Sequence, residues 1–227
     1  MSKRPKYWNR AVKYLSKKDP VMKKLISQYK DKTLTTRKDI FYSLCKSIIG
    51  QQISVQAANS VFKKFEKACN GKINPKKINK LRPVKLKRCG LSRQKVKGIK
   101  ELAIKFENKS FDPKKIKFMT DEEAIIYLSS LRQIGRWSAE MILLFTLNRP
   151  DIWPIQDIGL LRSISNNYKK KYFPPKRFVE IVYQKLINYR LSFDYFFWKG
   201  DSYFHLKTKS VSPFWLYLTI IDKIKRF

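Results

Sequence analysis

The chain has 227 residues, 43% of them hydrophobic, so it is long enough to bury one substantial core or two small ones. Lysine and arginine number 51 against 17 for aspartate and glutamate, which gives a formal net charge of +34. Such a charge favours a polyanionic partner. Because the basic residues are spread along the whole chain and form no basic amphipathic stretch, nucleic acid is favoured over a membrane surface.

Cysteine and histidine usage excludes several kinds of site. The three cysteines Cys45, Cys69 and Cys89 are widely spaced without a CxxC pair, which argues against a disulfide framework and a metal cluster. His205 is the only histidine, so neither a histidine-based metal site nor a Ser-His triad can be assembled. The first ten residues lack an apolar signal region, and the apolar run at 214–221 is too short to span a bilayer. We expect a soluble protein that is not exported, whose chemistry uses carboxylates or lysines.

The apolar spacing is helical from the first element onward, and the sequence predicts an all-α protein. Between residues 7 and 29 it predicts two short helices that are broken at Asp19 and Pro20. The capping segment 35–39 (TTRKD) then opens a helix that ends at Gly50.

The middle of the chain continues as short helices. After the stretch GQQIS, a helix with Ser54 as its N-cap is predicted over about 54–69. Pro75, Pro83 and Gly90 cut the next, basic segment into short helices, the last of which leads into a longer one.

Two helices further along are joined by a tight turn, LRQIG, which ends at Gly135. Thr120 and the acidic residues after it cap the first helix, and the second is predicted over about 137–147. In a basic protein such a hairpin points backbone N–H groups outward at a helix N-terminus, where a phosphate oxygen can bind without any reading of base sequence. An ordinary helical hairpin within a core is the alternative, and the hairpin by itself does not decide between the two.

Asp157 is the candidate carboxylate. Pro150 and Pro154 force extended backbone, and Asp157 begins the next helix. It lies 157 − 135 = 22 residues after Gly135, enough for a helix out and a loop back, so we expect it near the turn. Asp157 is either a plain N-cap or a catalytic group. The two roles are compatible, because a helix N-terminus favours the ionised carboxylate.

Four ordered blocks resemble the helix-hairpin-helix (HhH-GPD) DNA glycosylases, and within them the alkylbase branch of 3-methyladenine type II. These blocks are SIIGQQISVQAANSVFKKF, CGLSRQKVKGIKELA, LRQIGRWSAEMILLF and RPDIWPIQD, and the resemblance extends over roughly residues 8–198. It implies an all-α, two-lobed fold with DNA bound in a cleft between the lobes. The expected lobes are a helical barrel over 36–150, and a second lobe formed by 1–35 and 151–227 that carries the aspartate.

The resemblance also implies roles for individual residues. Asp157 takes the position of the family's essential aspartate, which is expected to stabilise the cationic sugar of the transition state. Members that also nick the strand carry a lysine where Trp137 stands, and indole cannot form a Schiff base, so we expect no lyase activity. Trp137, together with Met141, is expected to line the base pocket, although packing in the core is an equal alternative for Trp137.

Base flipping leaves a gap in the duplex that a side chain must fill. By resemblance the wedge is Gln52, flanked by Gln51 and Ile53, in the turn between two helices. The alternative is that the two glutamines merely satisfy helix ends.

By resemblance, the turn LRQIG corresponds to the family's phosphate-binding hairpin, in which Gln133 replaces the first of two usual glycines. Carbonyls near Ser129 and Leu131 are expected to hold a monovalent cation against a phosphate. The four-cysteine iron–sulfur cluster that one branch of the superfamily carries near its C-terminus is not expected, because the chain has three cysteines and none beyond Cys89. The expected phosphate-binding residues are Gln133, Gly135, Arg136, Trp137 and Ser138.

The resemblance and the residues together predict a monofunctional DNA glycosylase that flips out and excises alkylated purines of the 3-methyladenine or 7-methylguanine type, leaving an abasic site. Its partner is double-stranded DNA with damaged bases. Two alternatives are a non-catalytic hairpin protein that only binds DNA, and a glycosylase for deaminated or oxidised purines. We expect a monomer with no cofactor beyond the cation, cytoplasmic (at the nucleoid) in a bacterium and nuclear in a eukaryote. The tail 199–227 has no clear match.

Overall fold

The computed structural model describes residues 4–30, 34, 39–187, 189, 192, 195 and 196. Every regular element in these ranges is a helix, which confirms the all-α prediction. Within the same ranges no helix is long and apolar enough to cross a membrane. The tail 199–227, His205 and most of the predicted capping segment 35–39 lie outside the described residues.

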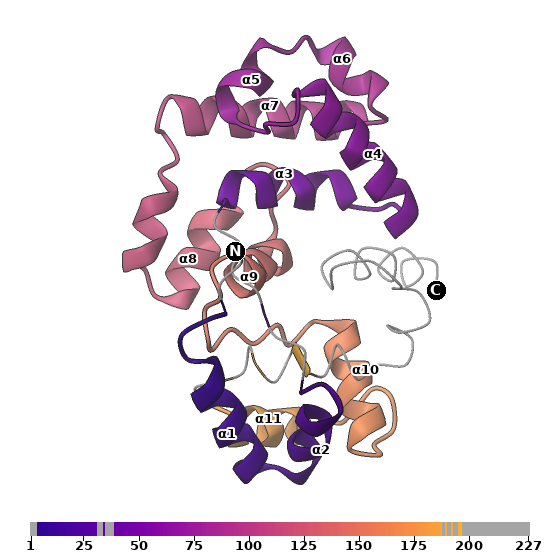
Figure 1. The fold of residues 1–227 in the computed structure, drawn as a ribbon, viewed down its shortest axis with the longest axis vertical. Coiled ribbons are helices and arrows are strands. Elements are labelled where there is room, and N and C mark those ends of the chain that lie inside the picture. The colour runs from indigo at the N-terminus through magenta and orange to yellow at the C-terminus, as the bar shows by residue number, and fades with distance from the viewer. Residues whose placement is uncertain are drawn as a thin grey trace. The chain divides into compact units, whose positions relative to one another are not determined.

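Residues 39–142 form one compact unit. Its core helix is α7, which packs against α3, α5 and α6, while α4 packs against α3 and α6. The side chains of Leu44, Ile48 and Phe65 are fully buried there. The helices of this unit are α3 (Ile40–Gly50), α4 (Val55–Ala68), α5 (Pro75–Lys80), α6 (Pro83–Arg88), α7 (Arg93–Glu107), the 3-10 helix η1 (Pro113–Phe118), α8 (Asp121–Ser129) and α9 (Arg136–Phe145) (Figure 1). The last residues of α9, from Leu143 on, belong to the second unit.

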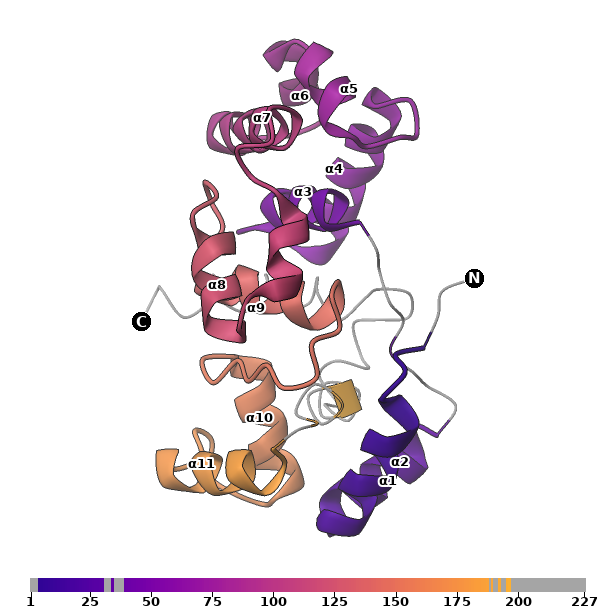
Figure 2. The same ribbon diagram turned by 90° about the vertical axis from the view of Figure 1, so that its left-hand side faces the viewer.

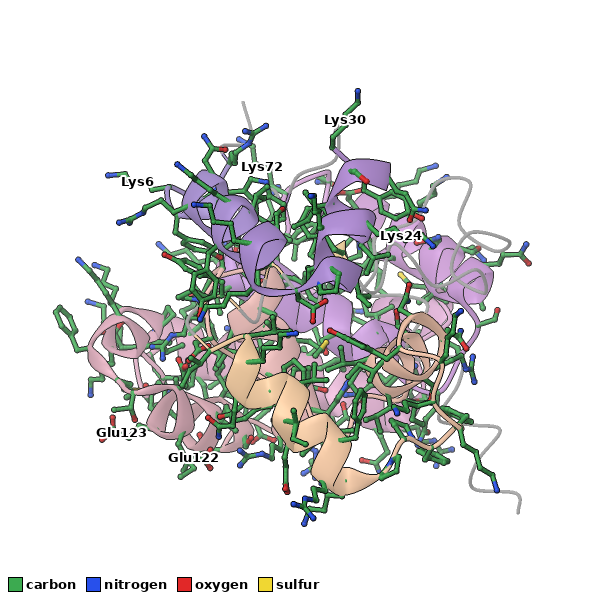
Figure 3. All side chains as sticks on the ribbon, turned by 90° about the horizontal axis from the view of Figure 1, so that it is seen from below. Lys6, Lys24, Lys30, Lys72, Glu122 and Glu123 are labelled. Carbon is green, nitrogen blue, oxygen red and sulfur yellow. The ribbon has the colours of Figure 1, made fainter. Side chains whose placement is uncertain are left out.

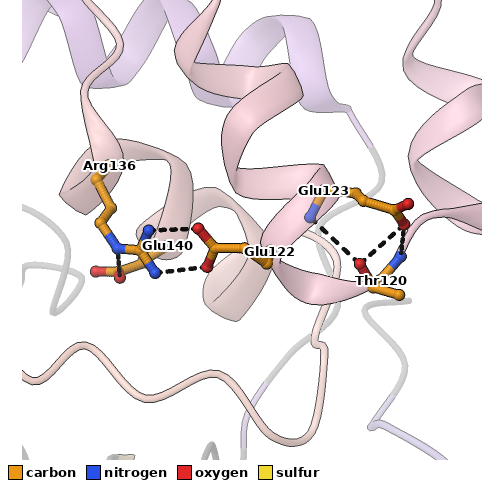
Figure 4. Close-up of polar contacts among 5 residues, drawn as sticks. All are labelled: Thr120, Glu122, Glu123, Arg136 and Glu140. Carbon is orange, nitrogen blue, oxygen red and sulfur yellow. Dashed lines mark hydrogen bonds and ion pairs between the residues drawn. The ribbon is translucent and has the colours of Figure 1, made fainter.

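Helix boundaries in this unit match the predicted caps. Ser54 caps α4, and Asp39, the last residue of the predicted capping segment, caps α3. Thr120 and Glu123 form a complete capping box at the start of α8 (Figure 4). The helix predicted over 137–147 begins one residue earlier and ends at Phe145. It ends there because Asn148 takes a left-handed φ of 53°, which turns the chain out of the helix.

The second unit contains the described residues of 1–38 and those from 143 onward. Its helices are α1 (Trp8–Lys18), α2 (Pro20–Gln28), α10 (Ile158–Asn167) and α11 (Lys176–Lys185). Helices α1 and α2 lie side by side (Figure 2). Trp8, only 3% exposed, packs edge-on against Tyr195 with a ring-centroid distance of 5.2 Å. The division into a lobe over 36–150 and a second lobe formed by 1–35 and 151–227, which the resemblance implies, stays a prediction.

The break between α1 and α2 falls where the sequence predicts it. Pro20 occupies the first turn of α2, and the Asp19 carboxylate accepts a hydrogen bond from the Met22 N–H at 3.0 Å. Asp19 is 1% exposed, and its other oxygen lies 2.7 Å from the ammonium of Lys185 at the end of α11. This ion pair ties the N-terminal helices to α11 across 166 residues of sequence.

Candidate functional site

The hairpin between α8 and α9 is anchored by buried apolar side chains, and its tip is exposed to solvent. Leu131 and Ile134, both 3% exposed, anchor the turn, and the Ile134 N–H donates to the Leu131 carbonyl at 3.0 Å. Gly135 is exposed, and a Cβ built on it would meet no atom within 4 Å. The first N–H groups of a helix have no carbonyl partner within that helix. The predicted phosphate site lies at this N-terminus of α9, and it stays a prediction.

Gln133, which stands where the resemblance places a glycine, adopts a left-handed backbone conformation. Its φ is +65°, in the left-handed region, so the turn forms at a cost of about 1–2 kcal/mol for a residue with a Cβ. The Gln133 side chain lies against α7 at Gly98, where any Cβ would collide with the Gln133 Oε1. That Oε1 is buried and has no hydrogen-bond partner within the described residues. Gly98 thus makes room for a glutamine in the hairpin.

Arg136 begins α9, and its guanidinium is occupied by two carboxylates (Figure 4). Its Nη1 and Nη2 each lie 2.6 Å from an oxygen of Glu122, and its Nε lies 3.2 Å from Glu140. The hydrogen bond from Arg136 lowers the pKa of Glu122, whereas burial raises the pKa of Glu140 despite the same arginine. A phosphate that binds Arg136, as the sequence predicts, must therefore compete with the exposed Glu122.

The predicted wedge lies in the turn between α3 and α4. Gln52 is exposed and has a left-handed φ of +57°, while Gln51 and Ile53 are half-buried. The Gln51 Nε2 donates to the carbonyl of Gln133 in the hairpin at 2.7 Å. Gln51 therefore holds the turn and does not simply satisfy a helix end, and Gln52 stands at its outer surface.

Lys95 is a residue of this region that the sequence reasoning missed. Its ammonium donates to the carbonyls of Ile49 at 2.8 Å and Gln51 at 2.6 Å, at the C-terminal end of α3. Burial lowers the pKa of Lys95. Its only sequence signal is its place three residues after Ser92, the N-cap of α7.

The two predicted pocket residues differ in exposure. Trp137, in the first turn of α9, is half-buried, whereas Met141 is 1% exposed. Ser138, one residue after the tryptophan, is 6% exposed. Trp137 is therefore the member of the pair with accessible surface, and Met141 lies in the packed part of α9.

Asp157 belongs to the unit that contains α10, and it caps that helix as predicted. It is 0% exposed, and its Oδ1 accepts a hydrogen bond from the Leu160 N–H at 2.7 Å. Its own N–H donates to the Pro154 carbonyl at 2.8 Å, so the loop that enters α10 fixes its backbone. The carboxylate is thus fixed at the N-terminus of α10, where the positive end of the helix dipole lies.

No group of three or more histidine, cysteine, aspartate or glutamate side chains among the described residues could hold a metal ion. The three cysteines are buried as free thiols, and burial raises the pKa of each, that of Cys69 to about 11. The predicted cation would use backbone carbonyls. Near them the Ser129 Oγ is buried and has no hydrogen-bond partner within the described ranges.

Lysines cover the surface of both units. Lys6 and Lys30 extend outward from the unit that contains α1 and α2, as does Lys72 from the helical unit at 39–142 (Figure 3). Glu122 and Glu123, at the start of α8, are among the few acids (Figure 3). The positive charge predicted to attract a polyanion is therefore solvent-exposed.

Comparisons with known proteins identify the family to which this chain is similar. A family model described as HhH-GPD superfamily base excision DNA repair protein matches residues 45–188. DNA-3-methyladenine glycosylase 1 of Schizosaccharomyces pombe is 26% identical over 193 residues, 84% of each chain. Alkylbase DNA glycosidase-like protein mag2 of the same yeast is 30% identical over 88% of this chain and 96% of that protein. The solved structure of S. pombe 3-methyladenine DNA glycosylase (Mag1) in complex with abasic DNA superposes with a TM-score of 0.71 at 25% identity, covering 84% of this chain and 95% of that one.

Proposed function

Because the chain belongs to the HhH-GPD superfamily of base excision DNA repair proteins, we propose that it is a monofunctional DNA glycosylase that excises alkylated purines and leaves an abasic site. The names of its relatives support the alkylated base, and the DNA complex of the similar structure supports duplex DNA as its partner. The enzyme works as a monomer on purines of the 3-methyladenine or 7-methylguanine type.

The buried carboxylate of Asp157 is the observation that carries this proposal. Its hydrogen bond to the Leu160 N–H and its place at the N-terminus of α10 hold the group in a fixed orientation, at the positive end of the helix dipole. Loss of the base leaves a sugar with oxocarbenium character. A fixed negative charge in a water-poor site stabilises that cation far better than the same charge in water. Asp157 therefore supplies the electrostatic stabilisation and orients the attacking water.

The alkylated base supplies the rest of the driving force. A purine methylated at N3 or N7 carries a positive charge, so it leaves without a strong general acid. An electron-rich indole face attracts such a cation, and Trp137 is the aromatic side chain with accessible surface at the head of α9. Met141, 1% exposed, contributes packing behind it.

The chain lacks a lysine at the position that strand-nicking members use. Trp137 occupies that position and cannot form a Schiff base. Lys95 is a described lysine whose pKa is lowered by burial, as a nucleophilic lysine requires. Its ammonium is held by the carbonyls of Ile49 and Gln51, which removes it from that role.

DNA is held through its backbone at the hairpin. The N–H groups around Gly135 and the first turn of α9 bind one phosphate, and carbonyls near Ser129 and Leu131 bind a monovalent cation beside it. The orphaned Ser129 Oγ fits such a cation as a further oxygen ligand. Gln52 enters the stack in place of the flipped base.

The proposal is tested by incubating the protein with duplex DNA that carries a single methylated purine, and measuring free base and strand breaks with and without alkali. Wild type is expected to release base, with breaks only after alkali. Asp157→Asn is expected to bind the duplex and to release base far more slowly than wild type. Asp19→Asn, which alters another buried N-cap, is the matched control and is expected to release base at the wild-type rate.

Three results would point elsewhere. Binding without base release by wild type, on methylated, deaminated and oxidised purines alike, would leave a non-catalytic DNA-binding protein. Release of a deaminated or oxidised purine alone would change the substrate. Strand breaks without alkali, with a borohydride-trapped adduct, would overturn the assignment of Trp137.

A further inference from the structure

The wedge turn, which carries Gln52 between α3 and α4, is held by hydrogen bonds from two groups outside it. The first is Lys95 on α7, whose ammonium donates to the carbonyls of Ile49 and Gln51. Carbonyls in the last turn of a helix have no partner within it, and a cation there is favoured by the helix dipole. Lys95 therefore closes the C-terminus of α3 at the point where the wedge turn begins.

The second fastening runs to the hairpin. The Gln51 Nε2 donates to the Gln133 carbonyl at 2.7 Å, and the Gln133 side chain packs against α7 at Gly98. Gln133 itself sits in a left-handed conformation that fixes the direction of its carbonyl. The wedge turn, the hairpin and α7 are thus linked within one unit of the molecule.

Helix α7 carries a second lysine whose ammonium also donates to carbonyls at the C-terminus of a helix, in this case a different helix. Lys100 donates to the carbonyls of Ile78, Asn79 and Leu81 at 3.2, 2.8 and 3.1 Å, which closes the C-terminus of α5. Lys95 and Lys100 are both half-buried. The two lysines differ in the segment that their closed helix leads into, since only α3 leads into the wedge turn.

We propose that Lys95 is a positioning residue for base flipping, which, with Gln51, holds the Gln52 wedge in register with the phosphate bound at the hairpin. The inference rests on the proposed function, in which Gln52 fills the gap. A side chain that inserts into a base stack must be held rigidly, because part of the binding free energy is otherwise spent on deforming the turn that carries it. The two charge-assisted hydrogen bonds of Lys95 and the hydrogen bond from Gln51 to the Gln133 carbonyl provide this rigidity.

The test uses a duplex with a tetrahydrofuran abasic analogue and a neighbouring 2-aminopurine, so that the wedge is assayed without any base being excised. Affinity for this duplex relative to the intact duplex, and the 2-aminopurine fluorescence change on binding, are measured for the full chain. Lys95→Met is expected to lower the preference for the abasic duplex roughly tenfold, the effect of about one charged hydrogen bond. Lys100→Met, the matched control, is expected to keep the wild-type preference.

A double-mutant cycle separates positioning from general stability. Gln52→Ala removes the wedge directly, so Lys95→Met added to it is expected to cause no further loss of preference. Lys95→Arg, which keeps the charge and the donors, is expected to recover most of the preference. If Lys95→Met does not fold, Gln51→Ala beside Lys95→Arg is measured in the same cycle, and it too is expected to add nothing to Gln52→Ala.

Equal losses in the Lys95 and Lys100 variants, additive losses with Gln52→Ala, or no loss at all would each overturn the role of Lys95. The proposed function fails separately. A wild-type protein that prefers the abasic duplex through Gln52 and Lys95, yet releases no methylated purine, would refute the base class and leave this inference standing.

Discussion

Asp19 and Asp157 both cap a helix with a buried carboxylate, and we propose that they have different roles. Each is an aspartate that caps a helix, each is buried at 1% or less, and each accepts a hydrogen bond from the N–H three residues on. At Asp19 the second oxygen is taken up by Lys185 in an ion pair that joins distant segments. At Asp157, in a segment that the family model covers, we propose that the carboxylate is the catalytic group.

The pair shows why capping alone does not identify a catalytic residue. A sequence search for aspartates before helices finds both, and burial does not separate them. The distinguishing information is the surrounding motif, RPDIWPIQD for Asp157, and the counter-charge on another helix for Asp19. Substitutions at the two sites are expected to separate catalysis from stability.

The largest expected effect is the loss of excision in Asp157→Asn. Asparagine caps a helix as well as aspartate does, so the free energy of unfolding should change little. The negative charge is lost, and single-turnover base release is expected to fall by about 10²–10³, the usual cost of one preorganised electrostatic contact. Quench-flow measurement of free base checks the rate, and urea unfolding checks the fold. If the variant released base as fast as wild type, Asp157 would only cap its helix, as Asp19 does, and would not be catalytic.

Asp19→Asn should show the opposite pattern. The cap is kept but the ion pair with Lys185 is lost, and the free energy of unfolding is expected to fall by about 2 kcal/mol. Base release per folded molecule should stay at the wild-type value. Urea unfolding of Asp19→Asn, Lys185→Met and the double variant tests this, and the double variant should lose less than the sum. Additive losses would mean that the pair does not couple.

The comparison extends to the hairpin, where Arg136 holds one exposed and one buried carboxylate. Glu122→Gln frees the guanidinium for a phosphate, so the affinity for duplex DNA at low salt is expected to rise by up to about fivefold. Glu101→Gln, which removes a half-buried acid paired with Lys105, controls for the change in net charge. Fluorescence anisotropy at two salt concentrations gives both affinities. Equal gains in the two variants would show that only net charge matters.

The smallest effect is a pH dependence at Glu140. Burial raises its pKa in the folded protein, so between its unfolded and folded pKa the folded state binds more protons. Wild-type stability should therefore fall relative to Glu140→Gln as the pH rises through that window. Urea unfolding of both proteins from about pH 4 to about pH 7 measures the difference. A difference that is constant with pH would contradict it, and a growing wild-type advantage would show that Arg136 outweighs burial.

Local signals made the helices predictable, and tertiary contacts set the rest. The break at Asp19, the cap at Ser54 and the capping box at Thr120 each depend on residues within one helical turn, and the structure confirms all three. Lys95 and Gly98 act on residues more than thirty positions away, so nothing in their neighbourhood marks them. The occupation of Arg136 by Glu122 was missed for the same reason, since it joins two helices across the turn.

The buried thiols have a consequence for a protein that meets alkylating chemicals. Electrophiles that methylate purines also react with thiolates, which are stronger nucleophiles than the neutral thiol. Burial keeps Cys45, Cys69 and Cys89 covered and raises the pKa of each, so almost none of the thiolate form is present near neutral pH. The helical unit at 39–142, which holds all three, is thereby resistant to the agents that create its proposed substrate.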